Sequence, residues 1–386
     1  MVYVLALLFL CSILGIGCKT ENRSLINRQG TENANQNRND SFLFSLLVII
    51  LVLFAGLRTI GNDTATYMRN FEMKTIDSLA GIFHIDWAIG SNPLFNIYSI
   101  VIKSIISDNA HVFIFLSAIL VQCSFLFFLR RYAPNFGFSI FLYVAFTVYA
   151  FTMAAMKQTL ATALAIWTIP MFAEGKKLVP TLMILVASLV HPYVVIFLFA
   201  LFLTGNVWDK KTALILGVTI LISFFLEPFL ETVLNVASEI GDEYDINDFT
   251  EGAGINIFRI AVYCVSPILS FIYREEIRNT DNPFYFLCIN LSVIASCFII
   301  LGSFGGANMF GRMANYFDLL YCISLIIVLK YGVTNSQTKF LLTSIAILCF
   351  CFFYFMYYYK YLNSSEYSTS WFSDFYKHIR LIKLFK

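Results

Sequence analysis

The sequence predicts an all-α, polytopic integral membrane protein with about 11 or 12 transmembrane or re-entrant helices, because apolar runs of spanning length recur along the whole chain. Composition agrees with this class, since hydrophobic residues make up 59% of the 386 residues and charged residues only 13%. Soluble domains contain roughly 45–50% apolar and about 25% charged residues. Phe, Trp and Tyr, which are counted among the hydrophobic residues, make up 17% of the chain. So little charge cannot cover the surface of soluble domains, which excludes a soluble enzyme, a soluble nucleic-acid-binding protein and a disordered chain.

Each predicted helix corresponds to one apolar run, because a bilayer crossing needs about 20 mostly apolar residues. The first run lacks a basic N-terminal region, so we expect a retained helix and not a cleaved signal peptide. A shorter run at 93–106 carries Lys103 and predicts a re-entrant or interfacial segment. Together the runs predict one membrane domain over residues 1–359. The longer runs lie at residues 2–18, 41–57, 111–129, 136–153, 158–173, 178–204, 212–230, 255–273, 283–302, 313–330 and 339–359.

Lys and Arg in short loops set the orientation of the helices. Residues 19–40 carry four of them, so this loop is expected in the cytoplasm and the motif loop 58–92 outside. The run 178–204 leaves two topologies open. It crosses the bilayer if it is one helix, and it dips in and returns if it breaks at His191-Pro192, where the proline disfavours helical geometry. We favour the break, because it places the 304–312 loop on the same side as 58–92.

Two segments outside the helices have a distinctive charge. Residues 231–251 hold seven acidic residues and no Lys or Arg, which predicts a solvated external loop at 231–254 or, alternatively, a flap over a substrate groove. Residues 360–386 alternate aromatic or aliphatic residues with Lys and Arg at helical spacing, which predicts an amphipathic basic tail at the membrane interface. The nine cysteines form no CxxC pair and the four histidines are scattered, so neither a disulfide framework nor a metal site is expected.

The densest group of polar residues follows the second run, where Arg58, Gly61, Asp63, Tyr67 and Arg69 lie close in sequence. Charges in or beside membrane helices cost about 2.5–3.5 kcal/mol at a helix centre, so they are the first functional candidates. Gly61 permits a turn, and Asp63 can cap a helix on which Tyr67 lies one turn later. A capped interfacial helix, with Arg58 reaching lipid headgroups, is the alternative.

Lys157-Gln158 and His191 are two further candidates within apolar runs. Lys157 is expected outside, where Lys is disfavoured, although a lysine reaching toward the interface is an alternative. His191 precedes the helix-breaking Pro192, and the unpaired backbone groups of such a break are tolerated only in a cavity or in packed protein. A buried histidine with no reactive role is the alternative there.

A glycine-rich segment at 302–311 delivers Arg312 to the start of a helix, with Asn315 and Tyr316 on the same face. Successive glycines let backbone N–H groups approach an anion. Arg259 is a weaker candidate near the external end of its run. The favoured topology therefore gathers cations with Asp63 and His191 near the external face, where Arg and Lys suit a diphosphate and a carboxylate or imidazole suits deprotonation of a hydroxyl.

The run Arg58-x-x-Gly61-x-Asp63-x-x-x-Tyr67 resembles a motif of the EpsG-like family of exopolysaccharide and O-antigen polymerases (Wzy type). Lys157 stands where the family commonly has Arg, which matters if a bidentate grip on phosphate is needed there. The resemblance spans about residues 45–320. Further signals follow in that family's order, namely Asn92-Pro93-Leu94-Phe95, Lys157-Gln158, His191 and Gly311-Arg312-x-x-Asn315-Tyr316-Phe317.

The resemblance implies a polymerase of O-antigen, capsule or exopolysaccharide in the bacterial cytoplasmic (inner) membrane, with a relation to the GT-C type membrane glycosyltransferases and an active site facing outside. It would transfer a growing glycan from an undecaprenyl diphosphate carrier to a hydroxyl of another lipid-linked repeat unit, with no cofactor. Expected partners are the lipid-linked oligosaccharide, the bilayer and a chain-length regulator. Asp63 or His191 would act as base. Diphosphate or substrate would be bound by Arg58, Tyr67, Arg69, Lys157, Gln158, Arg312 and Tyr316.

Other membrane functions stay open. A flippase for lipid-linked oligosaccharides would spread charge along a central cavity, and here charge gathers near one face. An O-antigen ligase uses similar chemistry and differs in its product, a single capped species in place of a ladder. A membrane O-acyltransferase is less favoured, because no early Arg-rich or His-containing helix motif is present. A purely structural membrane subunit is a further alternative.

Overall fold

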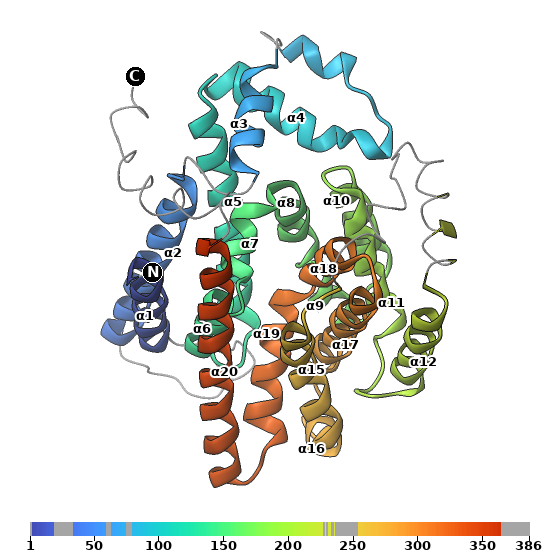
Figure 1. Cartoon of the computed structure of the whole chain (residues 1–386). Helices are drawn as coiled ribbons and strands as arrows, with labels where there is room; N and C mark the ends of the chain where they lie inside the picture. The colour runs from blue at the N-terminus through green and yellow to red at the C-terminus, as the bar shows by residue number, and fades with distance from the viewer. Residues whose placement is uncertain are drawn as a thin grey trace. The chain divides into compact units, whose positions relative to one another are not determined.

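Helices account for every regular element of the described chain, and Figure 1 labels the α-helices among them. The computed structural model describes residues 2–18, 34–58, 63–74, 79–226 and 254–363, together with Pro228, Glu231, Thr232 and Asn235. The all-α prediction is confirmed for this part of the chain. Its residues cluster into two compact units: unit 1 comprises residues 1–86, 93–163 and 351–386, and unit 2 comprises 87–92 and 164–350.

Unit 1 is built around α5, which packs against α2, α3, α6 and α7. Small residues let two other helices approach closely, because a Cβ on Gly137 of α6 would lie 2.8 Å from the Gly15 carbonyl oxygen of α1. Its helices are α1 (Val2–Gly17), α2 (Ala34–Gly56), α3 (Thr64–Glu72), η2 (Leu79–His84), α4 (Pro93–Val101), η4 (Ile102–Ile106), α5 (Ala110–Tyr132), α6 (Phe136–Ala145), α7 (Val148–Ala154) and α8 (Met156–Ala165).

The predicted run 136–153 is two helices, because Thr147 adopts a left-handed conformation with φ of 64° between α6 and α7. Buried polar bonds hold this break. Gln122 of α5 accepts a hydrogen bond from Tyr143 at 2.7 Å and donates one to Thr152 at 2.8 Å. Tyr149 donates to the Leu51 carbonyl of α2 at 2.8 Å. These bonds link α5 to α6 and α7, and α7 to α2, just before α8, which carries Lys157 and Gln158.

Unit 2 is built around α17, which is apolar on all sides, buried along most of its length and packed against α12, α15, α18 and α19. Its helices are η3 (Ile89–Ser91), α9 (Thr168–Ala173), α10 (Leu178–Ser188), η5 (Pro192–Leu198), α11 (Phe199–Phe202), α12 (Lys210–Phe224), α15 (Ile257–Ile272), α16 (Arg274–Arg278), α17 (Pro283–Phe304), α18 (Ala307–Asn315), α19 (Asp318–Ile327), η6 (Val328–Gly332) and the first half of α20 (Ser336–Asn363).

The break predicted at His191-Pro192 is confirmed. α10 ends at Ser188, His191 is extended with φ of −154°, and Pro192 begins the 3₁₀ helix η5. The short helices α10 and η5 pack against each other. The run 178–204 is therefore not one continuous helix, as the rule for residues before proline predicts.

Three described helices, α5, α17 and α20, are long and apolar enough to cross a membrane, and the bent pairs α6–α7 and α18–α19 raise the number to five if each pair is one span. That is fewer than the expected 11 or 12 transmembrane or re-entrant helices. The difference arises because proline, positive φ and polar bonds divide several apolar runs into short helices. Five further apolar helices or helix pairs are shorter, at 10–17 residues.

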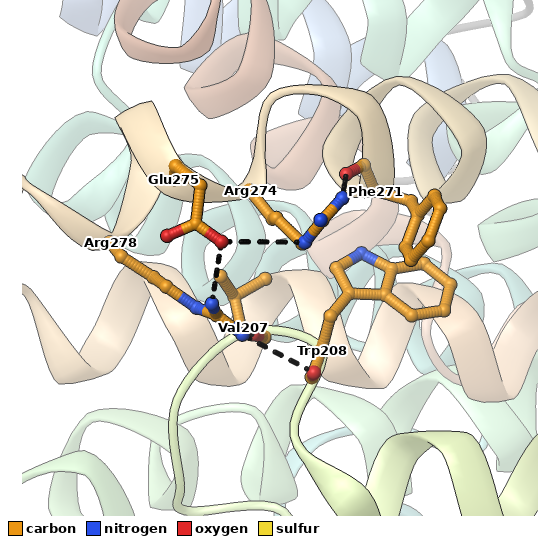
Figure 2. Close-up of polar contacts among 6 residues, drawn as sticks. All are labelled: Val207, Trp208, Phe271, Arg274, Glu275 and Arg278. Carbon is orange, nitrogen blue, oxygen red and sulfur yellow. Dashed lines mark hydrogen bonds and ion pairs between the residues drawn. The ribbon is translucent and has the colours of Figure 1, made fainter.

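The two ends of unit 2 differ in their loops. At one end the turn between α11 and α12 contacts α15 and α16, and Figure 2 shows Arg278 donating to the carbonyls of Val207 and Trp208, at 3.0 and 3.4 Å. Glu275 pairs there with Arg274 and Arg278. At the other end the Ile255 N–H donates to the Gly302 carbonyl at 2.9 Å, beside the turn between α17 and α18.

Several predicted segments lie outside the described residues. They are the Gly61 turn, most of the basic loop 19–40, most of the acidic loop 231–254 and residues 364–386 of the amphipathic tail. Predictions for them stay predictions, as does the domain assignment of residues 1–359.

Candidate functional site

Arg58 follows α2 and links it to α3. Its Nε donates to the Thr64 hydroxyl at 3.0 Å, and its Nη1 donates to the Ala55 carbonyl. The side chain is only 5% exposed. Burial lowers the pKa of Arg58 to about 10, so the guanidinium keeps its charge at neutral pH. In this geometry Arg58 joins two helices, and its predicted role in binding diphosphate stays a prediction.

Asp63 occupies the N-cap position of α3, as predicted, but its side chain makes no capping hydrogen bond. The carboxylate is exposed, as is the Arg69 side chain at the other end of the helix. Tyr67 is half-buried, and its ring contacts Phe95 of α4 edge-on at 6.2 Å. Residues Thr64–Glu72 of the motif segment thus form the predicted helix α3. The expected side-chain cap is not formed, because the Asp63 carboxylate is exposed to solvent.

Lys157 and Gln158 lie in the first turn of α8, as predicted. The Lys157 ammonium lies over the Phe95 ring, 5.2 Å from its centroid. Gln158 is 3% exposed, and its backbone carbonyl accepts a hydrogen bond from the Thr162 hydroxyl at 2.8 Å. Lys157 therefore reaches the same aromatic residue that Tyr67 contacts.

Two lysines that sequence reasoning did not select complete this cluster. The Lys74 ammonium donates to the Asn96 side-chain oxygen at 2.9 Å. Lys103 donates to the carbonyls of Phe71, Glu72 and Lys74, at 2.9, 2.9 and 2.6 Å. Burial lowers the pKa of Lys74 to about 8, and the charges of Lys157 and Lys103 add to this effect. Among the described residues, no carboxylate forms an ion pair with any of these three lysines.

In unit 2, His191 and Tyr316 are brought together. The Tyr316 hydroxyl lies 2.5 Å from Nδ1 of His191, a hydrogen-bond contact between η5 and the residue that follows α18. Tyr316 is 1% exposed and packs edge-on against Phe197. The extended backbone at His191 and the end of α18 at Asn315 together place the two rings. The two residues lie 125 positions apart in the sequence, and their contact was not predicted.

A polar network surrounds Asn315. Arg259 donates to the Asn315 side-chain oxygen at 3.0 Å, and the Tyr263 hydroxyl donates to the Asp318 carboxylate at 2.6 Å. Gly311 permits the close approach of Arg259, because a Cβ there would lie 3.3 Å from the Arg259 Nη1. Tyr263 was not selected from the sequence, since an isolated tyrosine in an apolar run gives no signal.

Arg312 is exposed, and its Nε donates to the Asn308 side-chain oxygen at 3.1 Å. Gly306 begins α18 with φ of 61°, a conformation that glycine favours. Arg312, Asn315 and Tyr316 were expected on one face. Asn315 contacts Arg259 of α15 and Tyr316 contacts His191 beside η5, so each has a partner on a neighbouring helix, and a shared role with Arg312 stays a prediction.

Each unit therefore holds one group of the predicted residues. Unit 1 holds Asp63, Tyr67, Arg69, Lys157 and Gln158 with Arg58, and unit 2 holds His191, Arg312 and Tyr316. The prediction that residues of both units share one site stays a prediction. Over the described ranges, no group of three or more His, Cys, Asp or Glu side chains is placed to hold a metal ion.

Comparison with known protein families identifies a match over most of the chain. The model described as "EpsG family" matches residues 41–373, a range that includes every candidate residue from Arg58 to Tyr316. The resemblance drawn from the motifs is thereby confirmed. No curated protein and no solved structure matches the chain.

Proposed function

The chain belongs to the EpsG family, and from this membership we propose that it polymerises an exopolysaccharide, O-antigen or capsule. The reaction transfers a growing glycan from an undecaprenyl diphosphate carrier to a sugar hydroxyl of a second lipid-linked repeat unit. The hydroxyl oxygen bonds to the anomeric carbon, and the bond from that carbon to the diphosphate oxygen breaks. The leaving diphosphate keeps the electron pair.

The cationic cluster of unit 1 is the observation that carries this proposal. Lys74 and Lys157 are half-buried, and the described residues supply neither with a carboxylate partner. Fixed positive groups stabilise the charge that a leaving diphosphate develops. The exposed Arg69 and Arg312 are further cations that a diphosphate would contact.

His191 is our candidate for the base that deprotonates the acceptor hydroxyl. With Nδ1–H donating to the Tyr316 oxygen, Nε2 keeps the lone pair that accepts a proton. The contact also fixes the plane of the imidazole ring. Asp63, whose carboxylate is exposed, is the alternative base in unit 1.

The proposed orientation places the His191 end of unit 2 outside the cytoplasmic membrane. The opposite end carries Lys210, Lys211, Arg274, Arg278 and Lys330, and cytoplasmic loops are enriched in Lys and Arg. This distribution of Lys and Arg supports an external site. A relation to the GT-C type glycosyltransferases stays a prediction.

Glycan analysis in the native strain tests the function. Deletion of the gene should leave single repeat units on the surface in place of a ladder. His191→Ala and Arg312→Ala should fail to restore the ladder. The control variant Arg131→Ala, in the last turn of α5, should restore it. Loss of every surface repeat unit on deletion would indicate a flippase, and loss of only the final attachment step would indicate a ligase. Normal ladders from His191→Ala and Arg312→Ala would refute the assigned roles.

A further inference from the structure

We propose that Lys74 binds the lipid-linked diphosphate together with Lys157, and that Asn96 and Phe95 hold the two ammonium groups for it. The inference rests on the proposed function and adds a binding residue that lies outside every motif considered above. It concerns unit 1 alone.

Adjacent residues of α4 hold the two lysines. Lys74 donates to the Asn96 oxygen at 2.9 Å, and Lys157 lies over the Phe95 ring at 5.2 Å. Lys74 comes from the end of α3 and Lys157 from the start of α8, so two distant segments bring their ammonium groups to one turn of α4. An ammonium has three donors, and the contact with Asn96 uses one of those on Lys74.

Lys103 has a different role. It gives one hydrogen bond to each of three carbonyls at the end of α3, and these contacts use all of its donors. One of the three carbonyls belongs to Lys74 itself. Lys103 is therefore a positioning residue, since it holds the backbone from which the Lys74 side chain extends.

The charges of this cluster favour an anion. Like charges close together disfavour each other's charged state, and the described residues supply no carboxylate to offset them. A phosphate group would supply negative charge beside both lysines and accept the remaining donors of Lys74. Both the carrier diphosphate and the single phosphate of a bilayer lipid have this chemistry. Two neighbouring ammonium groups match two linked phosphates better, so we assign the diphosphate.

Binding to the full-length protein in nanodiscs of neutral lipid tests the assignment, with undecaprenyl diphosphate as the probe. Lys74→Met removes the charge and should weaken binding to the unit 1 site about tenfold to a hundredfold, the range for a hydrogen bond to a charged group. Lys74→Arg keeps the charge and should bind within about threefold of the native protein, a small change on the same scale. Lys176→Met is the matched control and should bind normally, because Lys176 is exposed and pairs with Glu174.

Asn96→Asp separates binding from folding. It gives Lys74 a carboxylate partner, so the fold should persist while diphosphate binding falls as it does in Lys74→Met. Normal binding by either Lys74→Met or Asn96→Asp would overturn the proposal. So would displacement of the probe by phosphatidylglycerol with equal sensitivity to Lys74→Met, because the cluster would then be a headgroup site.

The glycan ladder distinguishes this inference from the proposed function. Specific, Lys74-dependent binding of the diphosphate in a protein that makes no ladder would refute the polymerase and leave the binding site in place. A normal native ladder with undiminished diphosphate binding by Lys74→Met would refute the role of Lys74 and leave the polymerase in place.

Discussion

At the scale of single residues, the contact between Tyr316 and His191 gives the sharpest mutational test. Tyr316→Phe keeps the ring and its packing against Phe197 but removes the oxygen that orients the imidazole. Positioned acid–base groups contribute about a hundredfold or more to rate, so we expect about a tenfold to hundredfold loss of polymerisation with normal expression. Chain growth in membrane fractions measures it. Tyr331→Phe, which alters a hydroxyl at the opposite end of unit 2, should have no effect, and full activity in Tyr316→Phe would show that the contact does not orient the base.

The lowered pKa of Lys74 predicts how diphosphate affinity depends on pH. Its pKa is lowered from the usual 10.5 to about 8, so in the free protein it loses its proton as the pH rises through 8. Diphosphate affinity should therefore fall between pH 7 and 9, and the bound anion should raise the pKa again. In the unfolded chain the lysine titrates near 10.5, so the unfolded state binds more protons between pH 8 and 10.5, and this group makes the fold more stable as pH rises.

The Lys74→Arg variant is the reference for this pH test, because it keeps its charge throughout and retains every other group of the protein and of the ligand. The ratio of native to variant affinity should decrease from pH 7 to 9. A constant ratio would show that Lys74 does not titrate on binding.

At the scale of elements, Gly311 connects α18 to α15. An added Cβ in Gly311→Ala would lie 3.3 Å from the Arg259 guanidinium and displace it from Asn315. We expect lower polymerase activity with the fold retained, measured by ladder length and thermal unfolding. Gly217→Ala is the matched control, because a Cβ there meets nothing within 4 Å. It should leave activity unchanged and stabilise α12 by about 0.5–1 kcal/mol.

The turn between α11 and α12 depends on Asn290 of α17, which is fully buried. Its side chain accepts from the Trp208 N–H and donates to the carbonyls of Leu203 and Asn206. Asn290→Ala leaves these groups unpaired, so we expect a loss of about 1–3 kcal/mol and a lower thermal midpoint in detergent. Arg278→Ala, at the partly exposed contact in Figure 2, should cost less. The reverse order would place the main attachment of the turn at Arg278.

The helices and the helix break that were predicted correctly depend on residues close together in the sequence. Pro192 could be predicted to break its apolar run, because proline lacks the N–H donor and its ring clashes with the preceding turn, and apolar runs of this length favour helices. The kink at Thr147 depends on tertiary contacts, namely the buried hydrogen bonds of Gln122 and Tyr149. Lys74 was missed for the same reason, since its partner Asn96 lies 22 residues away.

At the scale of the whole molecule, composition was sufficient to predict an all-helical membrane protein, and the order of weak motifs was sufficient to predict the family. The number of crossings could not be predicted from apolar length alone, because breaks inside runs depend on buried polar bonds such as those of Gln122. The division of the candidate residues between two units was not predicted either. That division raises the question whether the protein has one anion site or two.

A polymerase of the proposed kind handles two lipid diphosphates, one on the donor and one on the acceptor. Unit 1 supplies Lys74 and Lys157, and unit 2 supplies Arg259 and Arg312. We therefore expect native mass spectrometry of the nanodisc complex to show two bound lipid diphosphates. Lys74→Met with Lys157→Met should retain one, Arg259→Ala with Arg312→Ala should retain the other, and neither variant should make a ladder. A single bound lipid that both double variants abolish would instead mean that the two groups of cations act on one diphosphate.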